Sequence, residues 1–175
     1  MQFKLPIIST LFAISAVASP VPSSETSCAQ QVVSALNDMT QQVTDLKGKI
    51  AGTTDVITLA NDIISGFDNN IVTLVTGVSL SCDSTLTKQD QEDVCNSAQA
   101  FINEDQSLIT TLNNKHTILS GSIWLHAVES AISGLASATS AYLTPIIDNA
   151  PVCGGIVKSE LQALETAINK AVGAY

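Results

Sequence analysis

The sequence contains no arginine, and this absence limits the partners that the protein can recognise. Lysine supplies all 7 basic residues, against 16 acidic ones, so the formal net charge is −9. Nucleic acids and anionic membrane surfaces require a basic binding surface, and arginine is the side chain that holds a phosphate or carboxylate with two hydrogen bonds. Aromatic residues make up only 4% of the chain, too few for a base-stacking platform. We therefore expect no nucleic-acid partner.

Motifs for catalysis and metal binding are also missing. His116 lies in a polar stretch and His126 lies beside Trp124, and we interpret both histidines as ordinary surface residues. No nucleophile elbow, phosphate-binding loop or zinc-protease helix occurs. Glu104 and Asp105 are adjacent acids, but a glycosidase needs two carboxylates on either side of a cleft, whereas neighbouring helix residues point in different directions. We predict no enzymatic activity, no cofactor and no metal site.

The start of the chain has the pattern of a secretory signal peptide. One early basic residue, Lys4, precedes an apolar run from Leu5 to Val17, and Ala16 and Ala18 occupy the small positions of a cleavage site. This pattern predicts a signal peptide over residues 1–18. The run is too short to span a bilayer, and polar residues interrupt every later apolar stretch, so no transmembrane segment is expected.

Residues 19–27 form a Pro/Ser/Thr-rich linker that suits O-glycosylation. No Asn-x-Ser/Thr sequon is present, so N-glycosylation is not expected. Residues 28–175 have the length of one ordinary domain. We expect a secreted protein that is extracellular or associated with a cell wall.

Apolar residues recur in steps of three and four through the remaining chain, which predicts amphipathic helices. Gly52 and Asp55 separate the first helix from the second as a stop signal and an N-cap. The first stripe consists of Val32, Leu36, Met39, Val43, Leu46 and Ile50. The second consists of Ile57, Ala60, Ile64, Phe67, Ile71, Leu74 and Val78, and is widened by Val56, Ile63 and Val75, so this helix should be deeply buried.

Three more helices follow the same rule. Thr87 should cap the third, and the polar segment 113–121 should end it; Pro145 should end or kink the fourth. Their stripes are Val94, Ala98, Phe101, Leu108 and Leu112; Leu125, Val128, Ile132, Leu135, Thr139 and Tyr142; and Val157, Leu161, Leu164, Ile168 and Val172. No alternating strand pattern is present. The fold class is therefore all-α, an antiparallel up-and-down bundle of about five long amphipathic helices.

The four cysteines, an even number in a chain expected to be secreted, predict two disulfides. Cys28, Cys82, Cys95 and Cys153 all fall near the same pole of an up-and-down bundle, and three pairings are possible. The short loop favours Cys82–Cys95, which leaves Cys28–Cys153 to join the first helix to the last. Free or metal-bound thiols are the alternative, but no Cys-x-x-Cys pair supports a metal site.

Asp105 interrupts the third stripe between Phe101 and Leu108. A buried carboxyl needs a partner or stays protonated. One interpretation is a polar residue that sets the packing register through a hydrogen bond to a hydroxyl or water. The other is that Asp105 lines an internal cavity and contacts the polar end of a ligand.

The fourth helix, residues 122–143, carries an apolar stripe but is otherwise built from Ala, Ser and Gly. Small residues permit close helix packing, or they leave space. A long bundle filled with Ala, Val, Ile and Leu must pack tightly to avoid voids, and an apolar channel along its axis would suit a long acyl chain. Both interpretations remain open from the sequence.

The segment LHAVESAISGLASATSAYL, within a Ser/Thr/Ala-rich five-helix domain that follows a signal peptide, resembles the hydrophobic surface binding protein A / cell-wall galactomannoprotein family of filamentous fungi. The resemblance implies a secreted or wall-associated protein. Some members adsorb to hydrophobic solids and help to recruit polyester-degrading enzymes, and others hold fatty acids inside a five-helix bundle. The partners it implies are therefore a fatty acid or other apolar ligand, a hydrophobic solid surface, a secreted polyester hydrolase or a cell-wall polysaccharide.

We therefore expect a non-enzymatic binding protein for hydrophobic ligands or surfaces. A bundle that opens and spreads its apolar faces on a surface is a second possibility, and a structural cell-wall mannoprotein with no dedicated ligand is a third. For the ligand carrier, the predicted pocket lies between the second, third and fourth helices. Its residues are Phe67, Ile71, Phe101, Asp105, Leu108, Val128 and Leu135.

Overall fold

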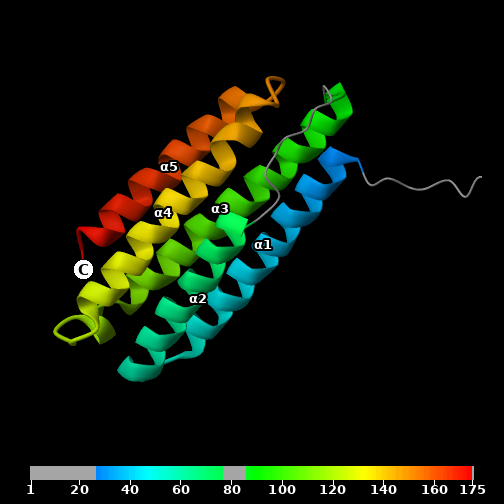
Figure 1. Ribbon diagram of the computed structural model, residues 1–175. Helices are drawn as coiled ribbons and strands as arrows, with labels where there is room; N and C mark the ends of the chain where they lie inside the picture. Colours follow the sequence, from blue (N-terminus) through cyan, green and yellow to red (C-terminus); the bar gives the residue numbers. More distant parts are fainter. Residues whose placement is uncertain (1–26, 77–85, 175) are drawn as a thin grey trace, which may run out of the picture.

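The computed structural model describes residues 27–76 and 86–174. The predicted signal peptide, the linker up to residue 26, Val78 and Cys82 lie outside the described residues. Five helices form the structure, and the described residues include no strand: α1 (Cys28–Gly52), α2 (Val56–Thr76), α3 (Lys88–Leu119), α4 (Leu125–Asp148) and α5 (Gly154–Val172). Successive helices run in opposite directions (Figure 1). The predicted all-α bundle of five long helices is confirmed.

The helices pack in an order that differs from their order in the sequence. Neighbouring helices follow one another as α1, α3, α5, α4 and α2, and α2 closes the ring against α1. Because α3 lies across this ring from α4 and α2, its contacts with them are sparse. Helices that are next but one in the sequence run in the same direction (Figure 1), so α1/α3, α3/α5 and α2/α4 are parallel neighbours.

Side-chain hydrogen bonds link two of the three parallel pairs. The Thr44 hydroxyl of α1 lies 2.9 Å from Oε1 of Glu104 in α3, and Gln99 Nε2 of α3 lies 3.2 Å from Oε1 of Glu160 in α5. These partners are 60 and 61 residues apart. These two parallel pairs therefore join residues separated by about two helix lengths.

Local caps explain where the helices begin. Ser27 and Gln30 form a reciprocal capping box at the start of α1, with both hydrogen bonds present. Thr87 and Asp90 do the same for α3, which confirms Thr87 as a cap. The Thr58 amide donates to Oδ2 of Asp55 at 2.8 Å, as expected of an N-cap, and this bond lowers the pKa of Asp55.

The predicted stripe of α1 is confirmed, since all six of its residues are buried. The stripe of α2 is partly wrong. Ile57 is 55% exposed, whereas Leu59, which lies outside the predicted stripe, is completely buried. Ile64 and Ile71 are only half-buried. The reason is that α2 contacts α1 on one side and α4 on the other, so its buried surface is rotated from the stripe that a single partner would require.

The predicted end of the third helix is also wrong. The helix continues through the polar segment to Leu119, and ends where Gly121 adopts a positive φ of 80°. Asn113 and Asn114 point to solvent, while Leu112 and Leu119 stay buried seven residues apart. Polar residues on the outer face thus resembled a helix end. Pro145 does not end α4, which continues to Asp148.

A disulfide joins Cys95 of α3 to Cys153, with 6.3 Å between their Cα atoms. Both predicted pairings, Cys82–Cys95 and Cys28–Cys153, are therefore wrong. The physical reason is the ring order: the start of α3 lies against the start of α5, while α1 does not contact α5. Cys28 is disulfide-bonded as well. The starts of α1, α3 and α5 lie at one pole of the bundle (Figure 1). Cys28 is the first residue of α1, Cys95 lies near the start of α3 and Cys153 directly precedes α5, so the predicted stapling of one pole is confirmed for the described residues.

Gly66 allows α2 to approach α1 closely. A Cβ atom at this position would lie 2.7 Å from Cδ2 and 3.0 Å from Cγ of Leu46, which is buried. Gly48, which lies near the end of α1 at an exposed position, has no atom within 4 Å of the equivalent point. The two glycines therefore differ in packing while both lie inside helices.

We expect Gly66→Val to lower the free energy of unfolding by about 2 kcal/mol, because the added atoms must displace Leu46. Gly48→Val is the matched control, and we expect a change of less than about 0.5 kcal/mol, since valine and glycine differ modestly in helix propensity. Urea denaturation followed by circular dichroism measures both. Equal effects of the two variants would show that the α1–α2 contact tolerates the extra volume.

Candidate functional site

The seven residues of the predicted pocket lie on α2, α3 and α4. Six of them are completely or almost completely buried, and Ile71 is half-buried. The apolar members share one continuous core. This core includes residues of all five helices, so it is not formed by α2, α3 and α4 alone. The role of these residues in binding stays a prediction.

Asp105 is the most unusual residue of this interior. It is completely buried, and neither carboxyl oxygen has a hydrogen-bond partner among the described residues. Burial raises its pKa to about 8, and the negative charge of Glu104 adds to the shift. The hydroxyl of Thr139 is close enough to oppose the shift, but it does not reach hydrogen-bond geometry. At neutral pH Asp105 is therefore mostly a protonated carboxylic acid that can donate a hydrogen bond.

The approach of Asp105 to Thr139 crosses the ring. Asp105 belongs to α3 and Thr139 to α4, and these helices are not neighbours. Their polar side chains therefore meet in the interior that the five helices surround. If Asp105 set the packing register through a hydrogen bond to a protein hydroxyl, its carboxyl group would have a hydrogen-bond partner. Among the described residues it has none.

Sequence reasoning missed several other buried polar atoms. The Thr139 hydroxyl is buried and unpaired, although the sequence placed Thr139 in an apolar stripe. The hydroxyl of Tyr142, Nδ2 of Asn70 and Oε2 of Glu160 are also buried and have no hydrogen-bond partner among the described residues. The signal for Thr139 and Tyr142 was present, because polar residue types occupied seam positions of α4. An unpaired buried polar group costs about 1–3 kcal/mol, so each of these atoms needs an explanation.

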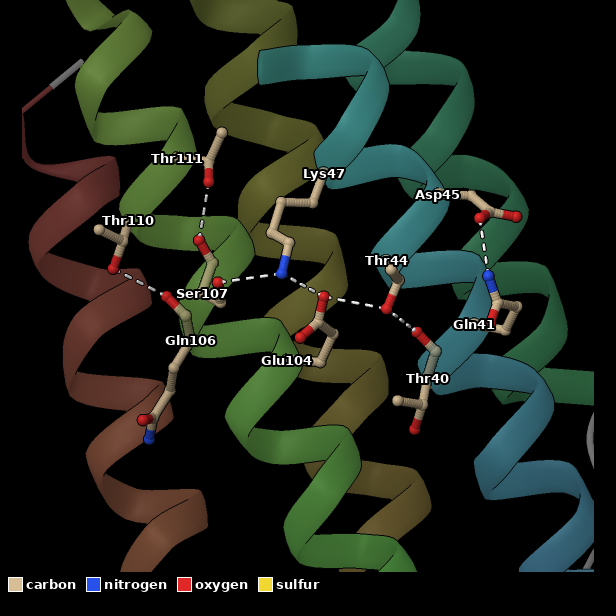
Figure 2. A network of polar contacts seen from close by, with 10 residues as sticks. All are labelled: Thr40, Gln41, Thr44, Asp45, Lys47, Glu104, Gln106, Ser107, Thr110 and Thr111. Carbon is tan, nitrogen blue, oxygen red and sulfur yellow. Dashed lines mark hydrogen bonds and ion pairs between the residues drawn. The ribbon is translucent and has the colours of Figure 1, made fainter. Parts of the chain in front are cut away.

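Glu104, the neighbour of Asp105, has the opposite environment. It forms an ion pair with Lys47 of α1 (Figure 2), and the Thr44 hydroxyl lies 2.9 Å from its Oε1. The bond from Lys47, with a smaller contribution from Thr44, lowers the pKa of Glu104. Lys47 also donates to the Ser107 hydroxyl at 3.2 Å. This network joins α1 to α3 near the surface. Of the two adjacent acids, Glu104 is therefore ionised near the surface, whereas Asp105 is protonated in the interior.

The small residues of α4 serve two neighbours. A Cβ atom on Gly134 would lie 3.0 Å from Cδ1 of Ile71, so the glycine permits the close approach of α2. On another side, α4 and α5 border an open groove of about 670 Å³. Its lining residues are Ala136, Ser137, Ser140, Ala141, Thr144, Pro145, Glu165 and Asn169. This groove is shallow and contains none of the predicted pocket residues.

The remaining candidates for chemistry lie at the surface. Nδ1 of His126 is 2.9 Å from Oε2 of Glu129, and the histidine side chain is 93% exposed. This agrees with the interpretation of His126 as a surface residue. Within the described part of the chain, no group of three metal-ligating side chains comes together. The helices described here also include none with the length and apolarity needed to cross a membrane.

The fold resembles that of two solved complexes of a protein with a fatty acid. One is Afmp4p in complex with palmitic acid, with a TM-score of 0.66 and 17% identity, covering 83% of this chain and 98% of the other. The second is ligand-binding domain 1 of the MP1 protein of Penicillium marneffei, complexed with arachidonic acids. It has a TM-score of 0.66 and 17% identity, with 84% and 97% of the two chains covered. At this identity the likeness establishes a shared fold.

Comparisons of the sequence with known families and proteins give no match. No family model matches the chain, and no curated protein matches it. The fold is thus shared with the two complexes at low sequence identity.

Proposed function

We propose that the protein is a non-enzymatic carrier that holds a long-chain fatty acid, or a similar single-chain lipid, between its five helices. The observation that carries the proposal is the shared fold: nearly the whole of each neighbour aligns, and each was solved with a fatty acid bound. The interior supports it, because an apolar core contains buried polar atoms that no described protein group pairs. A fatty acid would match both features, because its acyl chain is apolar and its polar end can form hydrogen bonds with such atoms.

The isolation of the buried carboxyl supports a binding role over catalysis. Asp105 has no hydrogen-bond partner among the described residues, so it lacks the oriented partner that a general base normally uses. The side chain of His126 is almost fully exposed on the outer surface and does not reach the interior. We propose that Asp105 contacts a ligand and transfers no proton in a reaction.

We also propose that the protein is secreted and belongs to the hydrophobic surface binding protein A / galactomannoprotein family. The signal-peptide pattern and the fold support this. The disulfide between Cys95 and Cys153, together with the bonded Cys28, is typical of an oxidising compartment. A role in the cell wall would follow from the same membership.

Native mass spectrometry of the purified protein, before and after gentle delipidation, tests the carrier function. We expect an additional mass that matches one or two fatty acids, its loss on delipidation and its return when palmitic acid is added. A protein that shows no bound mass and takes up no palmitic acid would contradict the proposal. Adsorption to a hydrophobic surface would then be the function to measure.

A tryptophan in the interior should block this uptake. Leu135 of α4 is completely buried, so we expect Leu135→Trp to fill the space that an acyl chain needs and to reduce palmitic acid binding at least tenfold. Ser130→Trp, at an exposed position of the same helix, is the control and should bind normally. Circular dichroism checks that both variants keep their helix content. Normal binding by folded Leu135→Trp would place the ligand elsewhere.

A further inference from the structure

Three buried polar side chains form a patch in the interior of the ring. Asp105 lies on α3, and Thr139 and Tyr142 lie on α4, three residues apart and therefore on one face of the helix. Both Asp105 oxygens and both hydroxyls are buried and have no hydrogen-bond partner among the described residues. Asp105 and Thr139 lie close enough to influence one another across the ring. The hydrogen-bonding capacity of these atoms is therefore left unused by the described protein groups.

Among the described residues, no arginine or lysine offers a bound ligand an unpaired positive charge in the interior. Arginine is absent from the sequence. Among the described lysines, Lys47 pairs with Glu104, and Lys115 donates to the carbonyl oxygens of Ala51 and Thr53. The other four described lysines are exposed. A free carboxylate beside Asp105 would therefore be an unpaired buried charge, which is strongly unfavourable.

We propose that Asp105, Thr139 and Tyr142 bind the polar end of the lipid, and that this end must bring or share a proton: a hydroxyl, or a carboxyl that shares one proton with Asp105. The inference rests on the proposed function and adds the place and chemical class of the head group. A hydroxyl can donate to Asp105 and accept from Thr139 or Tyr142. A carboxylate can bind only while Asp105 keeps its own proton to donate.

The other ionisable groups around this patch do not change the argument. Glu104, next to Asp105 on α3, faces outward to Lys47 of α1. On α4 the buried ionisable group is Tyr142, whose pKa burial raises further. On α5, Glu160 has one oxygen bonded to Gln99 and the other buried and unpaired. The described part of α2 contributes Asn70, which does not titrate.

The pH dependence of binding separates the two head groups. The experiment is equilibrium dialysis of the delipidated protein with radiolabelled palmitic acid or 1-hexadecanol, at monomeric concentrations and pH 6–9. Monomeric palmitate is already ionised in this range. Because the pKa of Asp105 is raised to about 8, we expect palmitate affinity to fall about tenfold between pH 7 and pH 9. Hexadecanol affinity should change less than about twofold.

Two variants test the residues themselves. Asp105→Asn should remove the fall in palmitate affinity, since the amide does not titrate. Thr139→Val keeps the shape of the side chain, and we expect it to weaken hexadecanol binding about fivefold, the value of one lost neutral hydrogen bond. Thr144→Val is the control, because the Thr144 hydroxyl is exposed and bonded to the Ser140 carbonyl. It should bind like the parent.

The outcomes distinguish this inference from the proposed function. Palmitate binding with the same pH profile in the parent and Asp105→Asn, together with normal hexadecanol binding by Thr139→Val, would overturn the head-group site but leave a lipid carrier. Failure of both lipids to bind the parent at any pH would overturn both. Should Asp105→Asn fail to fold, Thr139→Val and the parent pH profiles still decide the question.

Discussion

The free energy of unfolding of the delipidated protein is expected to fall as the pH rises from 5 to 8. The pKa of Asp105 is raised from 3.8 to about 8 in the folded protein. The folded state therefore keeps a proton that the unfolded chain has already released. Stability from this group is fully present below pH 3.8 and is lost as the pH rises towards 8, at up to about 1.4 kcal/mol per pH unit.

The expected loss between pH 5 and pH 8 is on the order of 3 kcal/mol, a large part of the stability of a typical domain. Asp55 and Glu104 shift in the opposite direction. Their contributions are present above the ordinary carboxyl pKa and are lost only at lower pH, so they do not mask the trend. Urea denaturation at pH 5, 6, 7 and 8, followed by circular dichroism, measures the slope.

Asp105→Asn is the control for this slope, because the amide cannot release a proton. We expect the profile of the variant to be flat between pH 5 and pH 8, whatever its absolute stability. Parallel profiles for the parent and the variant would mean that Asp105 is already ionised in the folded protein over this pH range.

Removal of the disulfide between α3 and α5 is expected to have a similarly large effect. Cys95 and Cys153 are 58 residues apart in the sequence, and closing a loop of this length in the unfolded chain corresponds to about 4 kcal/mol. We expect the double variant Cys95→Ala/Cys153→Ala to lose about this much free energy of unfolding. Alanine is suitable because Cys95 is buried, and a serine hydroxyl there would add a separate penalty.

Urea denaturation at pH 6 under non-reducing conditions measures the loss, and intact mass confirms that the bond to Cys28 remains. The parent protein at the same pH is the reference. A loss below about 1 kcal/mol would show that the start of α3 and the turn before α5 stay close together in the unfolded chain even without the bond.

The helices could be predicted from the sequence because each one buries a stripe against a neighbour, and periodicity records that stripe. Prediction of buried residues from this periodicity succeeded fully for α1, where all six predicted residues are buried. It failed for Ile57 and Leu59, because α2 serves two neighbours. It also failed at residues 113–121, because polar residues on an exposed face and polar residues after a helix look alike in a sequence.

The pairing of the helices could not be predicted, and the disulfide error followed from that. Periodicity shows which face of a helix is buried but not which helix covers it. The short loop between Cys82 and Cys95 favoured a disulfide between them, whereas the order of the helices in the ring places Cys95 beside Cys153. Asp105 was found because an acid in an apolar seam is conspicuous, but its approach to Thr139 depends on two helices that face each other across the ring.

The order of the helices in the ring also bears on how the chain folds. Helical bundles usually fold fast because their contacts join residues that are close in the sequence. Here α1 packs on α3, α3 on α5 and α2 on α4, and the bonded residues are 60 and 61 positions apart. Adjacent helices alone therefore build only two sides of the ring, α1–α2 and α4–α5. The other three sides require closure of long loops, so the protein should fold more slowly than a bundle in which successive helices are the main neighbours.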